Sequence, residues 1–309
     1  MKLTIFISLV GIALLWVSCS EFNVRSRKNA NRSQYPPEKM FEGDQLPAVQ
    51  KMYAGDLKGM VQEIKDRKLN LDQLNPKSGY TLLMYAAIIE DRKAMQQLLE
   101  MGADPNIIVP NTGYDTPLGH AVALTDYETL RLLFRYKVNP NPDVGSSPLC
   151  TAMMLGGFEG KTERKMIDFL LEHGADINHQ SFYGENIMEA AARDDLDHAN
   201  YFLDKGGNPF VPGTDWSPMA GEIAFTESKL REFNKTNTPY FKQLMDIKKR
   251  LIEKYGVTFP PKEADSVVKA SIRIKAYEKL SEKDKLSVNF EDNFGEKRYQ
   301  EDLKIAQGK

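Results

Sequence analysis

The sequence predicts an all-α repeat fold, in which pairs of short helices stack side by side and are joined by hairpins. The first observation behind this prediction is a triplet similar to Thr-Pro-Leu, which follows a turn and recurs at steps of 35, 31, 39 and 31 residues. The second is a helix-ending signature similar to Gly-Ala-Asp-Pro-Asn, which recurs at steps of 35, 37 and 32 residues. A period of this size is typical of a stacked-repeat architecture.

Each marker has a local structural reason. A Ser or Thr at the start of a triplet can cap a short helix, because its hydroxyl oxygen accepts a hydrogen bond from the first turn. Gly in the second marker can end a helix in the left-handed conformation, and the Asp, Pro and Asn that follow turn the chain into a projecting hairpin. The triplets begin at Thr81, Thr116, Ser147, Asn186 and Ser217. The helix-ending signatures begin at Gly102, Val138, Gly174 and Gly207, and their steps are counted at Asp104, Asn139, Asp176 and Asn208.

Together these markers resemble ankyrin repeats, whose signature includes Thr-Pro-Leu-His and Gly-Ala-Asp-x-Asn. The resemblance implies an ankyrin-repeat solenoid of helix-turn-helix and hairpin units with helical caps, over residues 44–260. A solenoid needs atypical ends, because its outermost repeats meet water on one side. The expected units are an N-terminal cap at Leu46–Asn70, the repeats Lys77–Asn106, Thr112–Asn141, Ser146–Asn178 and Gly184–Asn208, and a lengthened last repeat at Trp216–Tyr255.

Residues 1–18 are predicted to be a signal peptide, because the apolar run Leu3–Val17 is too short to span the hydrocarbon core of a membrane. The ending Trp16-Val17-Ser18-Cys19 resembles a bacterial lipobox, although it has Trp16 where that family prefers Leu. This resemblance implies that Cys19 is lipidated, and Ser20 then implies an outer-membrane lipoprotein that faces the periplasm. The alternative is ordinary signal-peptide cleavage without lipidation.

Two further segments flank the predicted repeats. Residues 19–43 are polar and basic, which predicts a lipid-anchored flexible linker, with contact to anionic lipid as an alternative role for its basic side chains. Residues 261–309 contain one amphipathic pattern followed by many charged residues. They are expected to form a C-terminal helix and a charged mobile tail.

Composition and charge argue against several classes of function. The 41 Lys and Arg residues nearly balance the 43 Asp and Glu residues, which leaves a net charge of −2 and no electrostatic footprint of a nucleic-acid-binding protein. Two cysteines and four scattered histidines offer little for a metal site, and Cys150 is expected to be a small buried apolar residue. No metal, cofactor or nucleic acid is therefore expected.

Two motifs have a chemical and a structural interpretation. The glycine-rich run 155–162 has Leu155 where a phosphate-binding loop needs its first Gly, and it is predicted to follow a helix rather than a strand. The acidic run 194–198, which ends in His198, lies between two predicted helices, where an Asp cap is favoured over a metal site. Because the sequence also lacks a recognisable nucleophile motif, no catalytic residue is assigned and the protein is not expected to be an enzyme.

A repeat stack without catalytic groups is expected to bind another protein. In ankyrin proteins the hairpins and the exposed side of each first helix form a concave binding surface, and its equivalents here are rich in aromatic residues and Met, as interface cores are. The alternative is that flanking helices or the C-terminal tail cover this face. The predicted partner-binding residues are Tyr80, Ile88, Ile89, Leu124, Met154, Leu155, Phe182, Tyr183 and Trp216, with Arg193 and Asp194 in the same register.

The combination of lipid anchor and ankyrin repeats carries a further expectation. Lipid-anchored ankyrin proteins of this layout resemble bacterial immunity proteins, which block a toxic effector before it reaches its target in the cell envelope. The resemblance implies a non-catalytic envelope protein that neutralises such an effector. The alternative is a scaffold or chaperone-like partner of a resident periplasmic enzyme.

Overall fold

The structure is a computed structural model that describes residues 27–109, 115–144, 147–155, 164–180, 186–210, 219–261, 266–280, 282, 285 and 295–307. The chain divides between Val109 and Pro110 into two compact units. Over the described residues both units consist of helices and turns without a β-strand. No helix in the described ranges combines the length and the apolar character that a membrane span requires.

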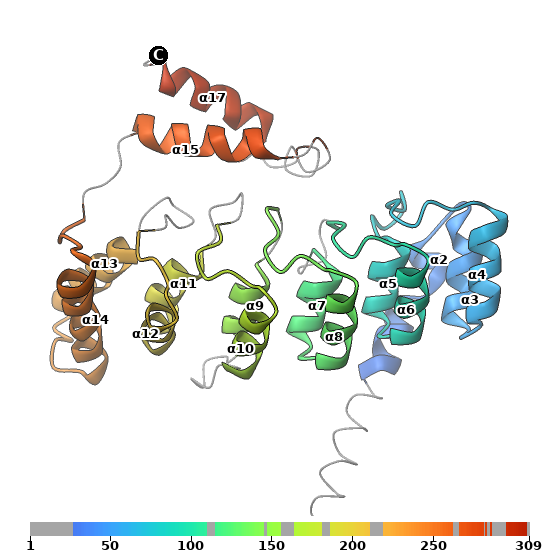
Figure 1. The fold of residues 1–309 in the computed structure, drawn as a ribbon, viewed down its shortest axis with the longest axis horizontal. Coiled ribbons are helices and arrows are strands. Elements are labelled where there is room, and N and C mark those ends of the chain that lie inside the picture. Colours follow the sequence, from blue (N-terminus) through green and yellow to red (C-terminus); the bar gives the residue numbers. More distant parts are fainter. Residues whose placement is uncertain are drawn as a thin grey trace, which may run out of the picture. The chain divides into compact units, whose positions relative to one another are not determined.

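The N-terminal unit contains two helix pairs preceded by two short helices (Figure 1). Within each pair the two helices contact each other, and α3 and α4 also contact α5 and α6 respectively. The elements are a helix at 27–34, α2 (Pro37–Met40), α3 (Gln45–Tyr53), α4 (Leu57–Asp66), α5 (Leu82–Ile88) and α6 (Arg92–Glu100).

The C-terminal unit contains four further helix pairs in which the first helix of one pair contacts the first helix of the next (Figure 1). Beyond them lie two more helices that pack on each other. The elements are α7 (Pro117–Ala123), α8 (Tyr127–Arg135), α9 (Pro148–Met154), α10 (Arg164–Glu172), α11 (Ile187–Asp194), α12 (Leu196–Asp204), α13 (Met219–Glu232), α14 (Pro239–Tyr255), α15 (Ser266–Lys279) and α17 (Glu296–Ala306).

The predicted caps begin the first helix of four pairs. The hydroxyl groups of Thr81 and Thr116 each accept a hydrogen bond from the backbone amide three residues later, at 3.0 and 3.1 Å. The Ser147 hydroxyl accepts from the equivalent amide at 3.3 Å. The Asn186 side chain accepts from the Met188 amide at 2.8 Å. Because a polar capping side chain starts each of these helices, the residues that follow it occupy equivalent positions in successive repeats.

Aspartates cap the second helix of several pairs. Asp56, Asp91 and Asp126 each accept a hydrogen bond from an amide of the next turn. Asp195 accepts from the amides of Asp197 and His198 at 3.0 and 3.1 Å. The cap predicted within the acidic run 194–198 is thereby confirmed.

The turns after the second helices follow one hydrogen-bonding pattern. The side-chain oxygens of Asn70, Asp104, Asn139, Asp176 and Asn208 each accept from the amide two residues later, at 2.8 to 3.1 Å. Neighbouring turns are also joined, since Asp72, Asn141 and Asn178 accept from the amides of Asp104, Asp176 and Asn208 at 2.7 to 2.9 Å. These bonds fix the spacing of consecutive hairpins within each unit.

Two of the glycine caps expected at the ends of the second helices are confirmed, since Gly102 and Gly174 have φ values of 97° and 94°. At the fourth signature the left-handed residue is Gly206, with a φ of 94°, one residue before the predicted Gly207. In the repeat whose signature begins at Val138, Lys137 occupies the position of Gly102 and Gly174 and has a φ of 59° as the left-handed residue. A non-glycine residue can adopt this conformation, although at a steric cost.

The prediction of a flexible linker over residues 19–43 is wrong for its described part. Arg27 and Asn31 donate hydrogen bonds to the carboxylate of Glu90, each at 2.9 Å. Phe41 is fully buried and packs edge-on against Tyr85, with 5.2 Å between the ring centroids. The segment shows no apolar period because it is held by isolated aromatic residues and ion pairs. Residues 1–26, which include the predicted signal peptide and Cys19, lie outside the described residues.

The prediction of a mobile tail after one C-terminal helix is also wrong, because α17 packs against α15. Arg273 donates two hydrogen bonds to Asp302 at 2.8 and 2.6 Å, and the Asp302 side chain is 1% exposed. The rings of Tyr277 and Tyr299 stack with centroids 4.8 Å apart. The sequence of α17 looks like a solvated segment because a buried ion pair, rather than an apolar stripe, joins the two helices.

Candidate protein-binding surface

The ends of the first helices form a set of equivalent positions, which we call the helix-end row. The row comprises the seventh and eighth residues after each cap, counted from the first residue of each triplet. Its first helices contact one another in sequence from α7 through α9 and α11 to α13. The members of the row are Ile88 and Ile89, Ala123 and Leu124, Met154 and Leu155, Arg193 and Asp194, and Ala224 and Phe225.

In the N-terminal unit the helix-end row is covered by the chain itself. Ile88 and Ile89 are both buried. Ile88 lies in a cluster with Met84 and Val109, against which Tyr35 and Tyr80 pack. The prediction that Ile88 and Ile89 lie open to a partner is therefore wrong: both are buried, and Tyr35, which precedes the first repeat, packs on the cluster that contains Ile88.

Tyr80 differs from these two residues, since it remains half-buried at the edge of the cluster. Burial, together with a smaller contribution from Tyr35, raises the pKa of its phenol above the ordinary value. Its ring helps to enclose the cluster, so that Tyr80 has a structural role in this unit. Whether it also contacts a partner stays a prediction.

In the C-terminal unit the same positions are open. Met154 is 59% exposed and Phe225 is 61% exposed. In both α9 and α13, several apolar residues earlier in the helix are buried. Leu124 and Leu155, at the corresponding positions after α7 and α9, are half-buried. Large apolar side chains at equivalent positions of neighbouring helices form the kind of surface that marks a protein-binding site.

Phe225 was not predicted from the sequence. It follows Ser217 by eight residues, as Leu124 follows Thr116 and Leu155 follows Ser147. Counting from the triplet would therefore have found it. The lengthened last repeat obscures this register, because α13 continues for two further turns beyond the row.

Phe182, Tyr183 and Trp216, which were predicted to contact a partner, lie outside the described residues. The glycine-rich run 155–162 also lies outside them, apart from its first residue Leu155. These residues stay predictions. The candidate surface is therefore built from Leu124, Met154, Leu155, Arg193, Asp194 and Phe225 alone, and we call these six residues the open row.

A charged pair lies at the centre of the open row. Arg193 and Asp194 face each other across two contacts of 3.2 Å, and both side chains are nearly half exposed. Burial, followed by the charges of Asp194 and Asp195, raises the pKa of the Tyr240 phenol at the start of α14. The two carboxylates thus create a negative local field next to the apolar side chains.

A second group of charged side chains joins α13 to α14. Glu227 contacts Lys248 of α14 at 2.5 Å and accepts from Arg231 at 2.8 Å. Burial opposes ionisation, but the hydrogen bonds from Lys248 and Arg231 outweigh it and lower the pKa of Glu227. These contacts hold α13 on α14 and so position Phe225.

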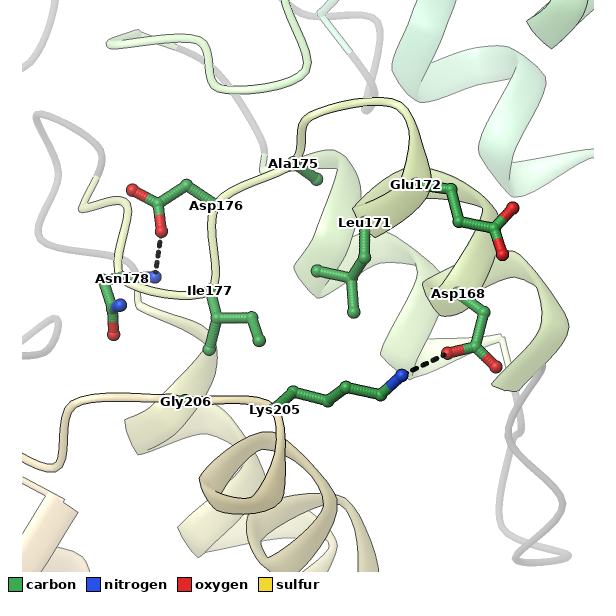
Figure 2. A pocket seen from close by; sticks show the side chains of 9 residues that line it. All are labelled: Asp168, Leu171, Glu172, Ala175, Asp176, Ile177, Asn178, Lys205 and Gly206. Atoms are coloured by element: carbon green, nitrogen blue, oxygen red, sulfur yellow. Dashed lines mark hydrogen bonds and ion pairs between the residues drawn. The ribbon is translucent and has the colours of Figure 1, made fainter.

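A pocket of about 420 Å³ lies elsewhere, between the second helices α10 and α12 (Figure 2). Its lining includes Asp168, Glu172, Asp176 and Lys205 around the apolar side chains of Leu171 and Ile177. Figure 2 shows Lys205 extended toward Asp168, and the ammonium and carboxylate are 3.8 Å apart.

Tyr201 donates a hydrogen bond to Asp168, and burial, followed by this hydrogen bond, raises the pKa of the Tyr201 phenol to about 12. The lining thus supplies carboxylates and an ammonium group but no serine, cysteine or histidine that could act as a nucleophile or base. Among the residues that the structure describes, no group of three or more His, Cys, Asp and Glu side chains converges to hold a metal ion. The pocket is an indentation between neighbouring repeats.

Comparison with known proteins agrees with the helix pairs. Residues 48–144 match the family model described as ankyrin repeats, three copies. A curated relative, the ankyrin repeat and KH domain-containing protein of Caenorhabditis briggsae, is 28% identical over 156 residues. That match covers 50% of this chain but only 6% of the relative.

A solved structure is also similar. It is a chain from the complex of a predatory endopeptidase of Bdellovibrio bacteriovorus with an immunity protein, with 19% identity and a TM-score of 0.43. The match covers 67% of this chain and 99% of that chain. The match of residues 48–144 to ankyrin repeats and the capped helix pairs together confirm the predicted fold class, an all-α repeat fold.

Proposed function

We propose that this chain is a non-catalytic protein-binding protein and that its partner binds the open row of the C-terminal unit. Ankyrin repeats suggest protein binding, and one observation selects the surface. Met154, the last residue of α9, and Phe225, midway along α13, are each about three-fifths exposed, although both helices also bury several apolar side chains. Such anchors contribute to affinity when a partner desolvates them.

The test of this proposal compares two phenylalanines on the same helical segment. Phe225→Ala removes a side chain of the open row, whereas Phe233→Ala removes one with a matching exposure of 62% just beyond the end of α13. Loss of a desolvated aromatic anchor costs at least about 2 kcal/mol, so Phe225→Ala should weaken partner binding by about 30-fold. Phe233→Ala should leave the affinity unchanged.

The measurement is a calorimetric titration against the purified products of the genes adjacent to the gene for this chain. Circular dichroism confirms that both variants retain the wild-type helix content. A partner whose affinity falls with Phe233→Ala but not with Phe225→Ala would contradict the assignment of the open row.

The finer proposal is that the partner is a toxic effector of the bacterial envelope and that this chain acts as its immunity protein. Its support is the sequence alone: the predicted signal peptide and Cys19 would hold the repeats where an incoming effector passes. If the product of an adjacent gene is toxic, co-expression of this chain should then restore growth of the cells that produce it. If the adjacent products bind without being toxic, the scaffold role is favoured instead.

The anchor is tested separately. If Cys19 carries the lipid, Cys19→Ala should move the protein from the detergent phase to the aqueous phase, or leave it unprocessed. The measurement is detergent phase separation of cell extracts followed by immunoblotting, with Cys150→Ala as the control because Cys150 is buried in the repeats. Normal membrane fractionation of Cys19→Ala would contradict the lipoprotein proposal.

A further inference from the structure

The segment that precedes the first repeat crosses the ends of two neighbouring first helices. Arg27 donates hydrogen bonds to both carboxylate oxygens of Glu90, two residues beyond the end of α5, and both distances are 2.9 Å. Arg32 donates to the carbonyl oxygen of Tyr53, the last residue of α3, and its guanidinium lies 4.4 Å from the centroid of the Tyr53 ring. Residues 27–35, which we call the strap, therefore bridge α3 and α5.

The strap closes an apolar face of the first repeat. Met84, Ile88 and Val109 form a buried cluster, which we call the covered face, and the ring of Tyr35 at the end of the strap packs against it. The hydroxyl group of Tyr85 donates a hydrogen bond to the Tyr35 carbonyl oxygen at 2.8 Å and holds this end of the strap in place. When the strap leaves, Tyr35 leaves with it, and water or another protein can reach the covered face.

The strap is held less firmly than the chain that follows it. None of residues 27–36 is buried, whereas Pro37 and Phe41 are. Segments with few buried apolar contacts open at a low free energy while the rest of the protein stays folded. The strap can therefore open by itself, with Pro37 and Phe41 as its fixed end.

The contact between Arg27 and Glu90 opposes this opening. The Glu90 side chain is only 8% exposed, and Asn31 also donates to its carboxylate at 2.9 Å. Bidentate hydrogen bonds between a guanidinium group and a carboxylate are stronger than neutral ones, and burial of the carboxylate limits competition from water. We call Arg27 and Glu90 the latch.

We propose that the strap is an autoinhibitory cover, which the latch holds closed over the covered face and which opens without unfolding the repeats. A protein that binds the covered face then binds only the open state, and its apparent affinity is reduced in proportion to the fraction of open chains. The inference goes beyond the proposed function, because it concerns the N-terminal unit alone and its test needs no partner.

Hydrogen–deuterium exchange of the full chain measures the opening directly. Backbone amides of the strap should exchange at least about tenfold faster than those of α5, because the strap opens locally whereas α5 exchanges only when the first repeat unfolds. Arg27→Ala should speed exchange of the strap by about a further tenfold, since it removes a pair of charged hydrogen bonds. Lys28→Ala, which removes the neighbouring cation of the same helix, is the matched control and should leave the rate unchanged.

Charge reversal separates the latch from a general loss of contacts. Arg27→Glu places two carboxylates against each other, so the strap should lose its protection while α3 and α5 keep theirs. The reciprocal variant, Arg27→Glu with Glu90→Arg, restores opposite charges at these positions and should recover most of the protection of the strap. Circular dichroism checks that the helix content of the repeats is retained.

Exposure of the covered face is measured with a cysteine probe. Ile88→Cys places a thiol beneath the strap, at a side chain that is 6% exposed. A maleimide should label it at least about tenfold faster when Arg27→Glu is also present, because the thiol reacts only in the open state and the closed state has lost its charged hydrogen bonds. Mass spectrometry of the peptides distinguishes position 88 from Cys19 and Cys150. Cys150, which is buried in the other unit, reports on unfolding there.

Any one of five results would overturn the inference. The strap and α5 exchange at the same rate in the wild type, or the strap exchanges no faster in Arg27→Ala and Arg27→Glu. In Arg27→Glu, α3 and α5 lose protection together with the strap, or the reciprocal variant fails to recover it, or the labelling rate at position 88 does not rise. The proposed function is judged separately, since its test rests on Phe225 in the C-terminal unit.

Discussion

Replacement of Leu118 by alanine is expected to lower the free energy of unfolding of the C-terminal unit by about 2–5 kcal/mol. Leu118 is buried in α7, which contacts both its pair helix α8 and the next first helix α9. The substitution leaves a cavity between neighbouring repeats, and in a repeat stack such a defect also weakens the interfaces on either side. The measurement is chemical denaturation followed by circular dichroism.

Ile252→Ala in α14 is the matched control, because it removes a large aliphatic side chain that is exposed in the same unit. It should change the free energy of unfolding by no more than about 0.5 kcal/mol. An unfolding midpoint of Leu118→Ala equal to that of wild type would show that the assigned repeat register is wrong.

Replacement of Arg273 by methionine is expected to unfold the pair formed by α15 and α17. Breaking a buried ion pair by removing one partner costs about 3–5 kcal/mol, because the remaining charge is left in a nonpolar site. Arg298, at 3.4 Å from Asp302, compensates only in part, since it approaches with a single contact. Hydrogen–deuterium exchange should show loss of protection in both helices while the repeats stay protected.

The double variant Arg273→Met with Asp302→Leu separates this cause from a general loss of packing. Replacing both charged groups by apolar ones of similar size should restore most of the protection, because no buried charge remains. Equal loss of protection in the single and double variants would mean that the ion pair is not what joins the two helices.

Much of the fold could be predicted from the sequence because the decisive interactions are local. Thr81, Thr116 and Ser147 cap helices within three residues of themselves, and Gly102 and Gly174 end helices through their own φ angles. Asp104 and Asp176 form turns with the amides two residues later. Such interactions depend on a few neighbouring residues, which a single sequence displays directly.

The candidate site could be predicted only in part. Counting from the caps placed Met154 and Leu155 on the binding face, and the same count places Phe225 there. The count also placed Ile88 and Ile89 there, but it could not tell that these two are covered. Exposure depends on segments that are distant in sequence, and Arg27 and Glu90 are separated by 63 residues.

The sequence by itself determined the repeat period, the caps, the hairpin turns and therefore the set of equivalent positions at the ends of the first helices. The tertiary structure decided which of those positions are open. It placed residues 27–41 over the first repeat and paired α15 with α17 through Arg273 and Asp302. Both features join polar segments without an apolar period, so their stability comes from long-range charge pairing and isolated aromatic contacts, which leave no periodic signal in the sequence.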